Sequence, residues 1–326
     1  MVGMTNKLTV VMYHYVRDVE GSPYPGLKAL GTRQFSDQLD YLQKNYEMVS
    51  MEAVLGALDD GTALPPKAAL LTFDDGYVEH YEYVFPQLVR RGIQGCFFPP
   101  AEAITQHKVL DVNKTHFVLA CSPDIDCLLR EIFDLLGRFR EEFELPSDEF
   151  YFRKLAVANR LDCKEVAFVK RLLQHELPEL VCTAILTELL ANRVGEGEAA
   201  FSKQLYMSET QLREMRARGM YIGSHGHRHR WLGLLPEQEQ EQEILKGREF
   251  INRIGESVDS WTMSYPYGSY NDSLVKLAAR QGCQLAFTTD AAVADLSTGN
   301  RFTLPRLDTN DLLCGNPERE NWWRQG

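Results

Sequence analysis

Two adjacent carboxylates directly follow a short apolar run in the first third of the chain, where residues 68–73 lead into Asp74-Asp75-Gly76. Such a run is typical of a strand buried in a parallel sheet. In barrel and doubly wound folds, the carboxyl ends of these strands face the ligand. Two neighbouring carboxylates repel each other and lose solvation on burial, so both stay ionised only beside a cation. An ordinary strand-ending turn is the alternative interpretation.

Three of the chain's eight histidines, His225, His227 and His229, fall within five residues. They follow a second strand-like segment, 220–224. Catalytic zinc takes three protein ligands, often imidazoles, and keeps one position open. Two histidines and one carboxylate from two strand ends would meet that requirement. Because histidines also gather in exposed loops, this cluster indicates a metal site only together with the Asp-Asp turn.

Strand-like runs that could position these side chains alternate with helical patterns along the chain. The expected strands are 8–13, 47–50, 68–73, 94–98, 221–225, 261–265, 285–288 and 302–306. Ser208 and Gln211 have the spacing of a capping box that opens a helix, and Gly219, Gly255 and Gly282 are typical helix ends. Alternation of this kind predicts a parallel sheet closed into a barrel.

Residues 107–205 break this alternation. Apolar residues such as Leu128 and Ile132 recur there at helical spacing, with charged residues on the opposite faces. We expect a helical insertion of about 100 residues, close to a small domain in size. It would divide the barrel into a first part, 1–106, and a second part, 206–326.

Composition limits the partners and the compartment. The net charge of −11 argues against nucleic acid or an anionic membrane as a partner. No apolar run approaches the ~18 residues that span a bilayer, and segment 8–13 lacks the features of a signal peptide. The seven cysteines show no zinc-site spacing and are odd in number, which favours a reducing compartment. We therefore expect a cytoplasmic protein without a transmembrane segment.

Three motifs resemble those of the polysaccharide deacetylases, the NodB-homology or carbohydrate esterase family 4 group. Residues 72–76, Thr-Phe-Asp-Asp-Gly, resemble the first motif, and residues 225–232, with the pattern His-x-x-x-His-x-x-Leu, are similar to the second. Residues 265–268, Tyr-Pro-Tyr-Gly, are similar to the third motif. The resemblance covers 8–100 and 206–312. It implies an α/β fold, a distorted (β/α)7-type barrel with a large helical insertion.

The resemblance also implies roles for individual residues. Asp75, His225 and His229 would bind a divalent metal, which we expect to be Zn²⁺. Asp74 would be the general base, and the backbone N–H of Tyr267 would donate to the oxyanion. The metal would polarise the amide carbonyl and acidify water. Asp74 and Asp75 could exchange roles, because adjacent residues on an extended turn point to different sides.

Two positions depart from the family pattern. Many members carry an arginine two residues before the proline of the third motif, where this chain has Ser264, and a late histidine as general acid, whereas no histidine follows His229 here. Arg306 could take the place of the missing arginine beside Asp74. Asp308 is a candidate proton carrier or a partner that orients Arg306. A buried salt bridge between Arg306 and Asp308 is the structural alternative.

His14 is the other candidate for the general acid. It follows the first expected strand, so it should face the barrel mouth. Its unperturbed pKa of about 6.5 suits proton transfer at neutral pH. A hydrogen-bonded histidine with a structural role is the alternative.

The resemblance implies metal-dependent removal of an N-acetyl group from an amino sugar, with release of acetate. A cytoplasmic location favours a precursor or intermediate of a cell-surface polysaccharide, such as O-antigen, as the substrate. A small-molecule amidohydrolase is one alternative, and a glycan-binding protein that keeps the metal without turnover is another. Asp74 argues against the second alternative, because binding alone does not require a base.

The insertion leaves the carboxyl end of a strand, where long insertions commonly shape the substrate site. We therefore expect residues 107–205 to wall the metal cleft and to restrict substrates to short or small glycans. The basic stretch 108–116 would meet a phosphate or an acidic sugar, with a solvated loop as the alternative. For Trp322-Trp323, packing onto the barrel and an oligomer contact are equal expectations.

Overall fold

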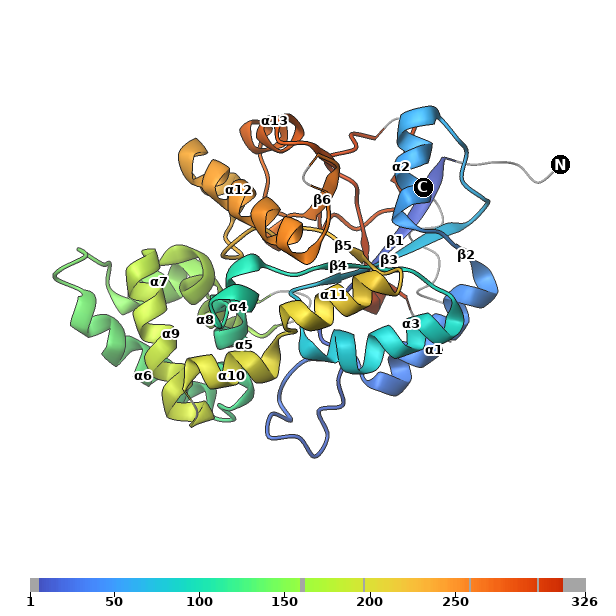
Figure 1. Cartoon of the computed structure of the whole chain (residues 1–326). Coiled ribbons are helices and arrows are strands. Elements are labelled where there is room, and N and C mark those ends of the chain that lie inside the picture. Colours follow the sequence, from blue (N-terminus) through green and yellow to red (C-terminus); the bar gives the residue numbers. More distant parts are fainter. Residues whose placement is uncertain (1–5, 159–161, 196, 258, 298, 313–326) are drawn as a thin grey trace. The chain divides into compact units, whose positions relative to one another are not determined.

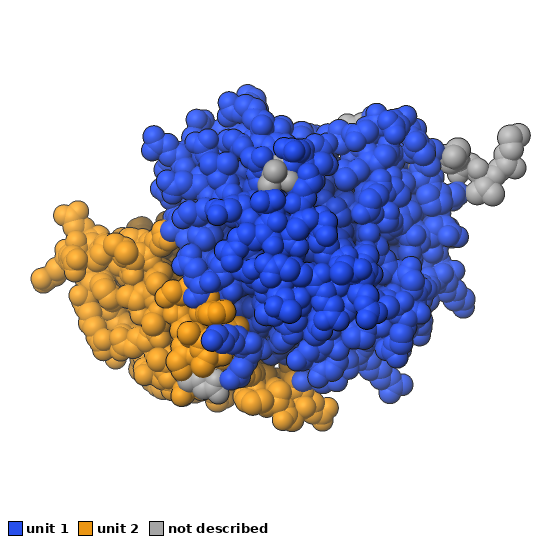
Figure 2. All heavy atoms as spheres, in the orientation of Figure 1, with its two compact units in different colours: residues 1–18, 29–106, 203–326 blue, residues 19–28, 107–202 orange. Residues whose placement is uncertain are grey.

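A computed structural model describes residues 6–158, 162–195, 197–257, 259–297 and 299–312, and Trp322-Trp323 lie outside these ranges. The chain forms two compact units, which Figure 2 shows in different colours. Unit 1 comprises Met1–Asp18, Ala29–Gln106 and Lys203–Gly326, and unit 2 comprises Val19–Lys28 and His107–Ser202. The expected domain boundaries stay a prediction.

Unit 1 alternates strands and helices (Figure 1). Its first part contains β1 (Lys7–Tyr13), α1 (Thr32–Asn45), β2 (Glu47–Met48), α2 (Met51–Asp60), β3 (Ala68–Asp74), η1 (His80–Val84), α3 (Phe85–Arg91), β4 (Gly95–Phe98) and α4 (Ala101–Thr105). Its second part contains α11 (Glu209–Ala217), β5 (Tyr221–Ile222), η3 (Leu232–Leu234), α12 (Glu237–Ile254), β6 (Trp261–Ser264), η4 (Pro266–Gly268), α13 (Asp272–Arg280), β7 (Cys283–Phe287), β8 (Ala294–Asp295), β9 (Leu307–Asp308) and η5 (Thr309–Asp311).

The main sheet runs in the order β5-β4-β3-β1-β8, with β2 also paired to β3 and β9 also paired to β1. All these pairs are parallel except β1 with β8, so the sheet is mixed. Strands β6 and β7 form a separate parallel pair. Single bridges join Ser224 to Met263 and Phe287 to Leu304. Among the described strands no closed barrel is found, although the expected α/β class is confirmed.

Both faces of the central strands are buried, which explains their continuous apolar sequences. On one face, residues of β1, β3, β4 and β7 share an apolar cluster that includes Leu8, Val10, Leu70, Phe98 and Phe287. On the other face, Tyr13 stacks on Phe73 and meets the ring of Phe35 from α1 edge-on. Because Phe287 lies on β7, which belongs to the second sheet, the two sheets share one apolar core.

The expected elements differ from the observed ones mainly in the last third of the chain. Seven expected strands correspond to β1–β7, and the capping box of Ser208 and Gln211 is present at the start of α11. The expected strand at 302–306 is wrong, because only Leu304 makes a single bridge there and β9 begins at Leu307. The short antiparallel strand β8 carries no clear apolar pattern and was not expected.

Unit 2 is helical, as the periodicity of its sequence indicates. Its helices are α5 (Asp111–Ala120), α6 (Ile125–Phe139), α7 (Asp148–Leu155), α8 (Lys164–Arg171), η2 (Leu172–Glu176), α9 (Glu179–Val194) and α10 (Glu198–Leu205), of which the last reaches into unit 1. Its apolar core includes Leu128, Ile132, Leu136, Phe168 and Leu186. None of the described helices has the length and apolar character needed to cross a membrane.

The basic stretch at the start of unit 2 is neutralised by carboxylates of the same unit. The buried Nζ of Lys114 lies 3.3 Å from Asp111 Oδ1 and 3.1 Å from Glu198 Oε1. The Nζ of Lys108 lies 3.7 Å from Glu198 Oε2. The expectation that the stretch 108–116 meets a phosphate is therefore wrong for Lys114, because its charge is buried in an ion-pair cluster, and stays a prediction for the rest of the stretch.

Candidate metal centre

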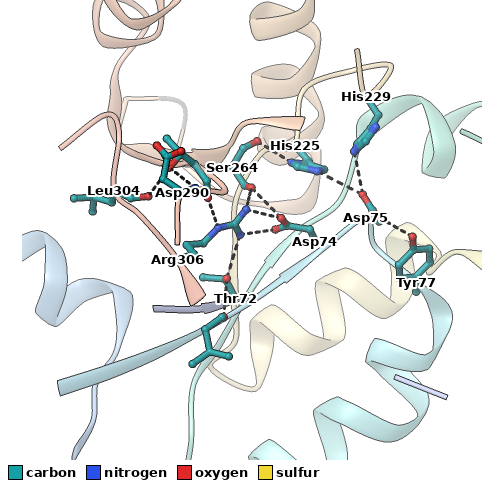
Figure 3. Close-up of polar contacts among 12 residues, drawn as sticks. Thr72, Asp74, Asp75, Tyr77, His225, His229, Ser264, Asp290, Leu304 and Arg306 are labelled. Atoms are coloured by element: carbon teal, nitrogen blue, oxygen red, sulfur yellow. Dashed lines mark hydrogen bonds and ion pairs between the residues drawn. The ribbon is translucent and has the colours of Figure 1, made fainter. Parts of the chain in front are cut away.

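The two carboxylates lie where β3 ends and the chain turns sharply. Asp74 is the last residue of the buried strand, and Asp75 and Gly76 both adopt a φ of 69°. A Cβ at Gly76 would lie 2.7 Å from Pro99 Cβ, so this turn requires glycine. The two side chains consequently diverge, with Asp74 directed toward Arg306 and Asp75 toward the histidines (Figure 3).

Residues 225–229, called the histidine loop below, follow β5. Strand β5 is hydrogen-bonded to β4 in the same sheet as β3. His225 and His229 are both buried. Gly226 and His229 have φ values of 71° and 55°, in the left-handed region that non-glycine residues rarely adopt. Parallel pairing of β3, β4 and β5 thus brings the carboxylate turn and the histidine loop to the same edge of the sheet.

Asp75, His225 and His229 face one another closely enough to share one ion. One ligand atom from each lies within 4.8 Å of the other two. The Oδ1 of Asp75 is 3.5 Å from His225 Nε2 and 3.3 Å from His229 Nε2 (Figure 3). His227 is also buried but lies outside this group, and its backbone N–H donates to Glu243.

The hydrogen bonds of the three side chains leave the facing atoms available to a metal. His225 Nδ1 donates to the carbonyl oxygen of Ser264 at 2.7 Å, which leaves the lone pair on Nε2. Tyr77 donates its hydroxyl to Asp75 Oδ2 at 2.6 Å. The other carboxylate oxygen, Oδ1, is buried and has no hydrogen-bond donor among the described residues. An orphaned oxygen between two imidazole nitrogens fits a divalent cation such as Zn²⁺.

The protonation states also suit metal binding. Burial alone would raise the pKa of Asp75, but the nearby His229 and His225 lower it well below its ordinary value. Burial lowers the pKa of His229, which therefore stays neutral near pH 7 although Asp75 opposes the shift. For His225, Asp74 and Asp75 outweigh burial and raise the pKa. A metal would therefore compete with a more tightly held proton at His225 than at His229.

Asp74 is held by Arg306 and Ser264 (Figure 3). Arg306 donates from Nη1 to Asp74 Oδ1 at 3.0 Å and from Nη2 to Oδ2 at 2.7 Å, a bidentate pair. The Ser264 hydroxyl donates to Asp74 Oδ2 at 3.0 Å and accepts from Arg306 Nη2 at 2.8 Å. Arg306 Nε donates to the carbonyl of Thr288 at 2.8 Å. Ser264 thus contacts both Asp74 through its hydroxyl and His225 through its carbonyl.

The Asp74–Arg306 pair is buried from water. Burial by itself would raise the pKa of Asp74, but Arg306 and His225 lower it below its ordinary value. Asp74 is therefore an ionised acceptor near the candidate metal ligands at neutral pH. A buried pair of this kind is costly to break from one side, because the remaining charge is left uncompensated.

The other expected site residues are distributed around this centre. The Tyr267 ring meets the His229 ring edge-on at 4.6 Å and stacks on Trp231 at 4.4 Å, and its backbone has a φ of 58°. His14 follows β1, and its charge contributes to the lowered pKa values of Asp74 and Asp75. The His14 carbonyl lies 2.7 Å from Nε2 of the buried His80.

Asp308 occupies a different environment from the one expected. Its Oδ1 accepts from the backbone N–H of Asn310 at 2.8 Å, which caps the short helix η5. The carboxylate partner of Arg306 is Asp74, and no hydrogen bond or ion pair between Arg306 and Asp308 is found within the described ranges. The expectation that Asp308 orients Arg306 is therefore wrong.

Sequence reasoning missed two groups that contact the site. Tyr77 lies two residues after Asp75 within the tight turn, and that proximity was the available signal. In the sequence, Ser264 stands out only as the position where many family members carry an arginine, and nothing there indicates a role for its hydroxyl. Its position at the end of β6, beside the carboxyl ends of the neighbouring strands, indicates that it should contact the centre.

Part of the chain is similar in sequence to known proteins. Residues 176–286 match the family model described as polysaccharide deacetylase. The Bacillus subtilis protein YxkH, whose name refers to the polysaccharide deacetylases, is 30% identical over 110 residues, or 34% of this chain and 39% of that protein. The Escherichia coli poly-β-1,6-N-acetyl-D-glucosamine N-deacetylase is 34% identical over 84 residues, or 26% of this chain and 12% of that protein. The chain thus matches well under half of either relative.

Solved structures share the fold over nearly the whole chain. The Streptococcus pyogenes deacetylase PplD in complex with acetate matches with a TM-score of 0.58 and 17% identity, covering 98% of this chain and 97% of that chain. IcaB from Ammonifex degensii matches with a TM-score of 0.57 and 20% identity, covering 99% and 98%. At such identities the likeness shows the fold alone. In sequence, part of this chain is similar to the polysaccharide deacetylases, and in fold nearly all of it is similar to solved deacetylase structures.

Proposed function

We propose that this protein is a metal-dependent hydrolase that removes an N-acetyl group from an amino sugar. The observation that carries the proposal is the buried Asp75–His225–His229 set beside an ionised Asp74. The Escherichia coli relative is named for deacetylation of a polymer of N-acetylglucosamine, which supports that sugar as the substrate class. We propose a precursor or intermediate of a cell-surface polysaccharide, such as O-antigen, as the substrate.

Asp75, His225 and His229 would hold the metal, for which we propose Zn²⁺. Bound there, the metal would polarise the acetyl carbonyl and lower the pKa of water. Asp74 would accept the proton of the attacking water as its oxygen bonds to the carbonyl carbon. Arg306 and Ser264 would keep the Asp74 carboxylate ionised and oriented.

The backbone N–H of Tyr267 would donate to the carbonyl oxygen as negative charge develops on it. The left-handed backbone of Tyr267 and the packing of its ring on Trp231 would fix the direction of that N–H. When the C–N bond breaks, acetate leaves and the amine takes up a proton. This proton completes the hydrolysis.

We propose His14 as the donor of that proton. Asp308 is the weaker candidate, because its carboxylate caps η5. The charge of His14 acts on both Asp74 and Asp75, and its backbone is held by His80. Histidine is the residue type that most often serves as a general acid in enzymes.

The proposal is tested by measuring acetate release from N-acetylated nucleotide sugars and N-acetylglucosamine oligomers. We expect equal amounts of acetate and free amine, loss of both after chelation, and recovery on addition of Zn²⁺. His225→Ala should remain inactive under the same addition. Acetate release only from non-sugar acetamides would instead favour a small-molecule amidohydrolase. Bound Zn²⁺ without acetate release from any substrate would favour a glycan-binding protein.

A further inference from the structure

The segment that joins the two histidines turns through two residues in the left-handed region. Gly226, with a φ of 71°, adopts this region readily, whereas His229, with a φ of 55°, carries a side chain that disfavours it. A left-handed conformation at a residue other than glycine costs free energy and persists only when the surroundings hold it in place. The contacts of residues 226–229 must therefore include a group that holds them.

One such group is the carboxylate of Glu243, on α12. Its Oε2 accepts from the backbone N–H groups of His227 and Arg228, both at 2.9 Å. Its Oε1 accepts from Arg228 Nε at 3.0 Å. The Glu243 side chain is only 1% exposed, so these bonds are shielded from water. Both carboxylate oxygens are engaged, and Glu243 lies outside the group of facing metal ligands.

The opposite side of the same segment is also held. The carbonyl oxygens of Gly226 and His227 accept from the backbone N–H groups of Ala101 and Glu102, at 3.2 Å and 2.9 Å. These two residues begin α4. The segment between the ligands is therefore fixed through its carbonyl groups by α4 and through its amide groups by Glu243.

A close helix approach brings Glu243 to this position. A Cβ at Gly247, one turn further along α12, would lie 2.5 Å from Ser224 Oγ and 3.3 Å from the carbonyl of Gly226. Glycine at 247 thus lets α12 pack directly against the backbone of the histidine loop. The sequence places a buried carboxylate and a glycine four residues apart, on the same face of the helix.

We infer that Glu243 is a positioning residue that sets the relative placement of His225 and His229 for metal binding. This inference rests on the proposed metal site. The inference can nevertheless fail while the metal site stands. Glu243 would act on His225 and His229 through the backbone, and the hydrogen bonds described above go to residues 227 and 228 and not to either imidazole.

The test compares Zn²⁺ affinity, measured by competition with a chelator, in the wild type and in Glu243→Gln. The amide keeps the size of the side chain but removes its charge and one acceptor oxygen. Loss of a group that orients a metal ligand typically weakens metal binding about 10–100-fold, and we expect a loss in this range. Glu241→Gln makes the same change at an exposed position of α12 and should keep wild-type affinity.

Two further measurements separate positioning from general destabilisation. With saturating Co²⁺, the visible spectrum of Glu243→Gln should change, whereas that of Glu241→Gln should not. Arg228→Met removes the ion pair but keeps both backbone bonds, so it should bind Zn²⁺ much more tightly than Glu243→Gln does. If Glu243→Gln does not fold, Glu243→Asp, which keeps the charge on a shorter side chain, should still weaken Zn²⁺ binding.

Wild-type Zn²⁺ affinity and an unchanged Co²⁺ spectrum in Glu243→Gln would overturn the inference and leave the proposed function standing. An equal loss in Glu241→Gln or in Arg228→Met would also overturn it. Absence of Zn²⁺ binding by the wild-type protein would overturn the inference together with the proposed metal site.

Discussion

At the scale of single residues, the two oxygens of Asp75 have different partners. Oδ2 accepts from the Tyr77 hydroxyl at 2.6 Å, and Oδ1 faces the two imidazoles. Burial raises the pKa of Tyr77 well above its ordinary value, so the hydroxyl keeps its proton and acts as a donor. The Tyr77 ring stacks on Tyr15 at 4.0 Å, which limits its movement. Tyr77 therefore fixes which carboxylate oxygen faces the histidines.

Tyr77→Phe should weaken Zn²⁺ binding, because Asp75 would then be free to rotate and one buried oxygen would lose its donor. We expect a loss of about 10-fold or more in affinity, measured by chelator competition. Tyr81→Phe is the matched control, since it removes a hydroxyl that donates to Glu214 at the surface. Equal affinities in Tyr77→Phe and the wild type would show that the tyrosine only fills space.

The proposed metal ligands stand out in the sequence, but several of the residues that contact them do not. Asp75, His225 and His229 stand in short motifs whose spacing carries the chemistry. Ser264 and Glu243 reach the same site from β6 and α12. Contacts of this kind depend on how the elements pack, and no local spacing encodes that. Arg306 is expected near Asp74 only because this chain has Ser264 where many family members carry an arginine.

At the scale of elements, the carboxyl ends of short strands position the site. One glycine, Gly223, lets the chain after β5 pass close to its neighbouring strands. Gly223 follows β5 and donates its backbone N–H to Phe97 at 2.8 Å. A Cβ there would lie 2.3 Å from Phe98 Cε1 and 2.9 Å from the carbonyl of Thr262. The histidine loop can therefore enter between β4 and β6 only because residue 223 has no side chain.

Gly223→Ala should lower the free energy of unfolding by about 1–3 kcal/mol, the usual cost of overpacking a dense core. Gly56→Ala is the control, because a Cβ there meets nothing within 4 Å and Gly56 lies within helix α2. It should raise the free energy of unfolding by about 0.4–1 kcal/mol. Urea denaturation of both variants checks this, and a Gly223→Ala protein as stable as the wild type would contradict the packing described here.

Long or strongly patterned elements could be predicted, and so could the short strands β2 and β5, whereas β8 and β9 could not. The apolar run of β3 and the amphipathic helix α6 are unambiguous in the sequence, and both are present. Strands β8 and β9 have two residues each and are held by pairing with β1. Two residues carry no periodicity, so tertiary contacts alone decide such strands.

At the scale of the whole molecule, two units share one chain, and each has its own core. The motif-bearing residues all lie in unit 1, and unit 2 is built around a separate helical core. The α/β class and the similarity to polysaccharide deacetylases were predictable from three motifs. The expected role of the insertion in limiting substrate size stays a prediction, because the motifs contain no information about it.

The central claim is that Asp74 acts as the base in a metal-dependent deacetylation without binding the metal. The most direct test measures acetate release and bound metal together in Asp74→Asn. We predict wild-type metal content with turnover reduced by about 10²–10⁴-fold, the usual contribution of a general base. Wild-type turnover in Asp74→Asn, with metal bound and a substrate in hand, would contradict the account.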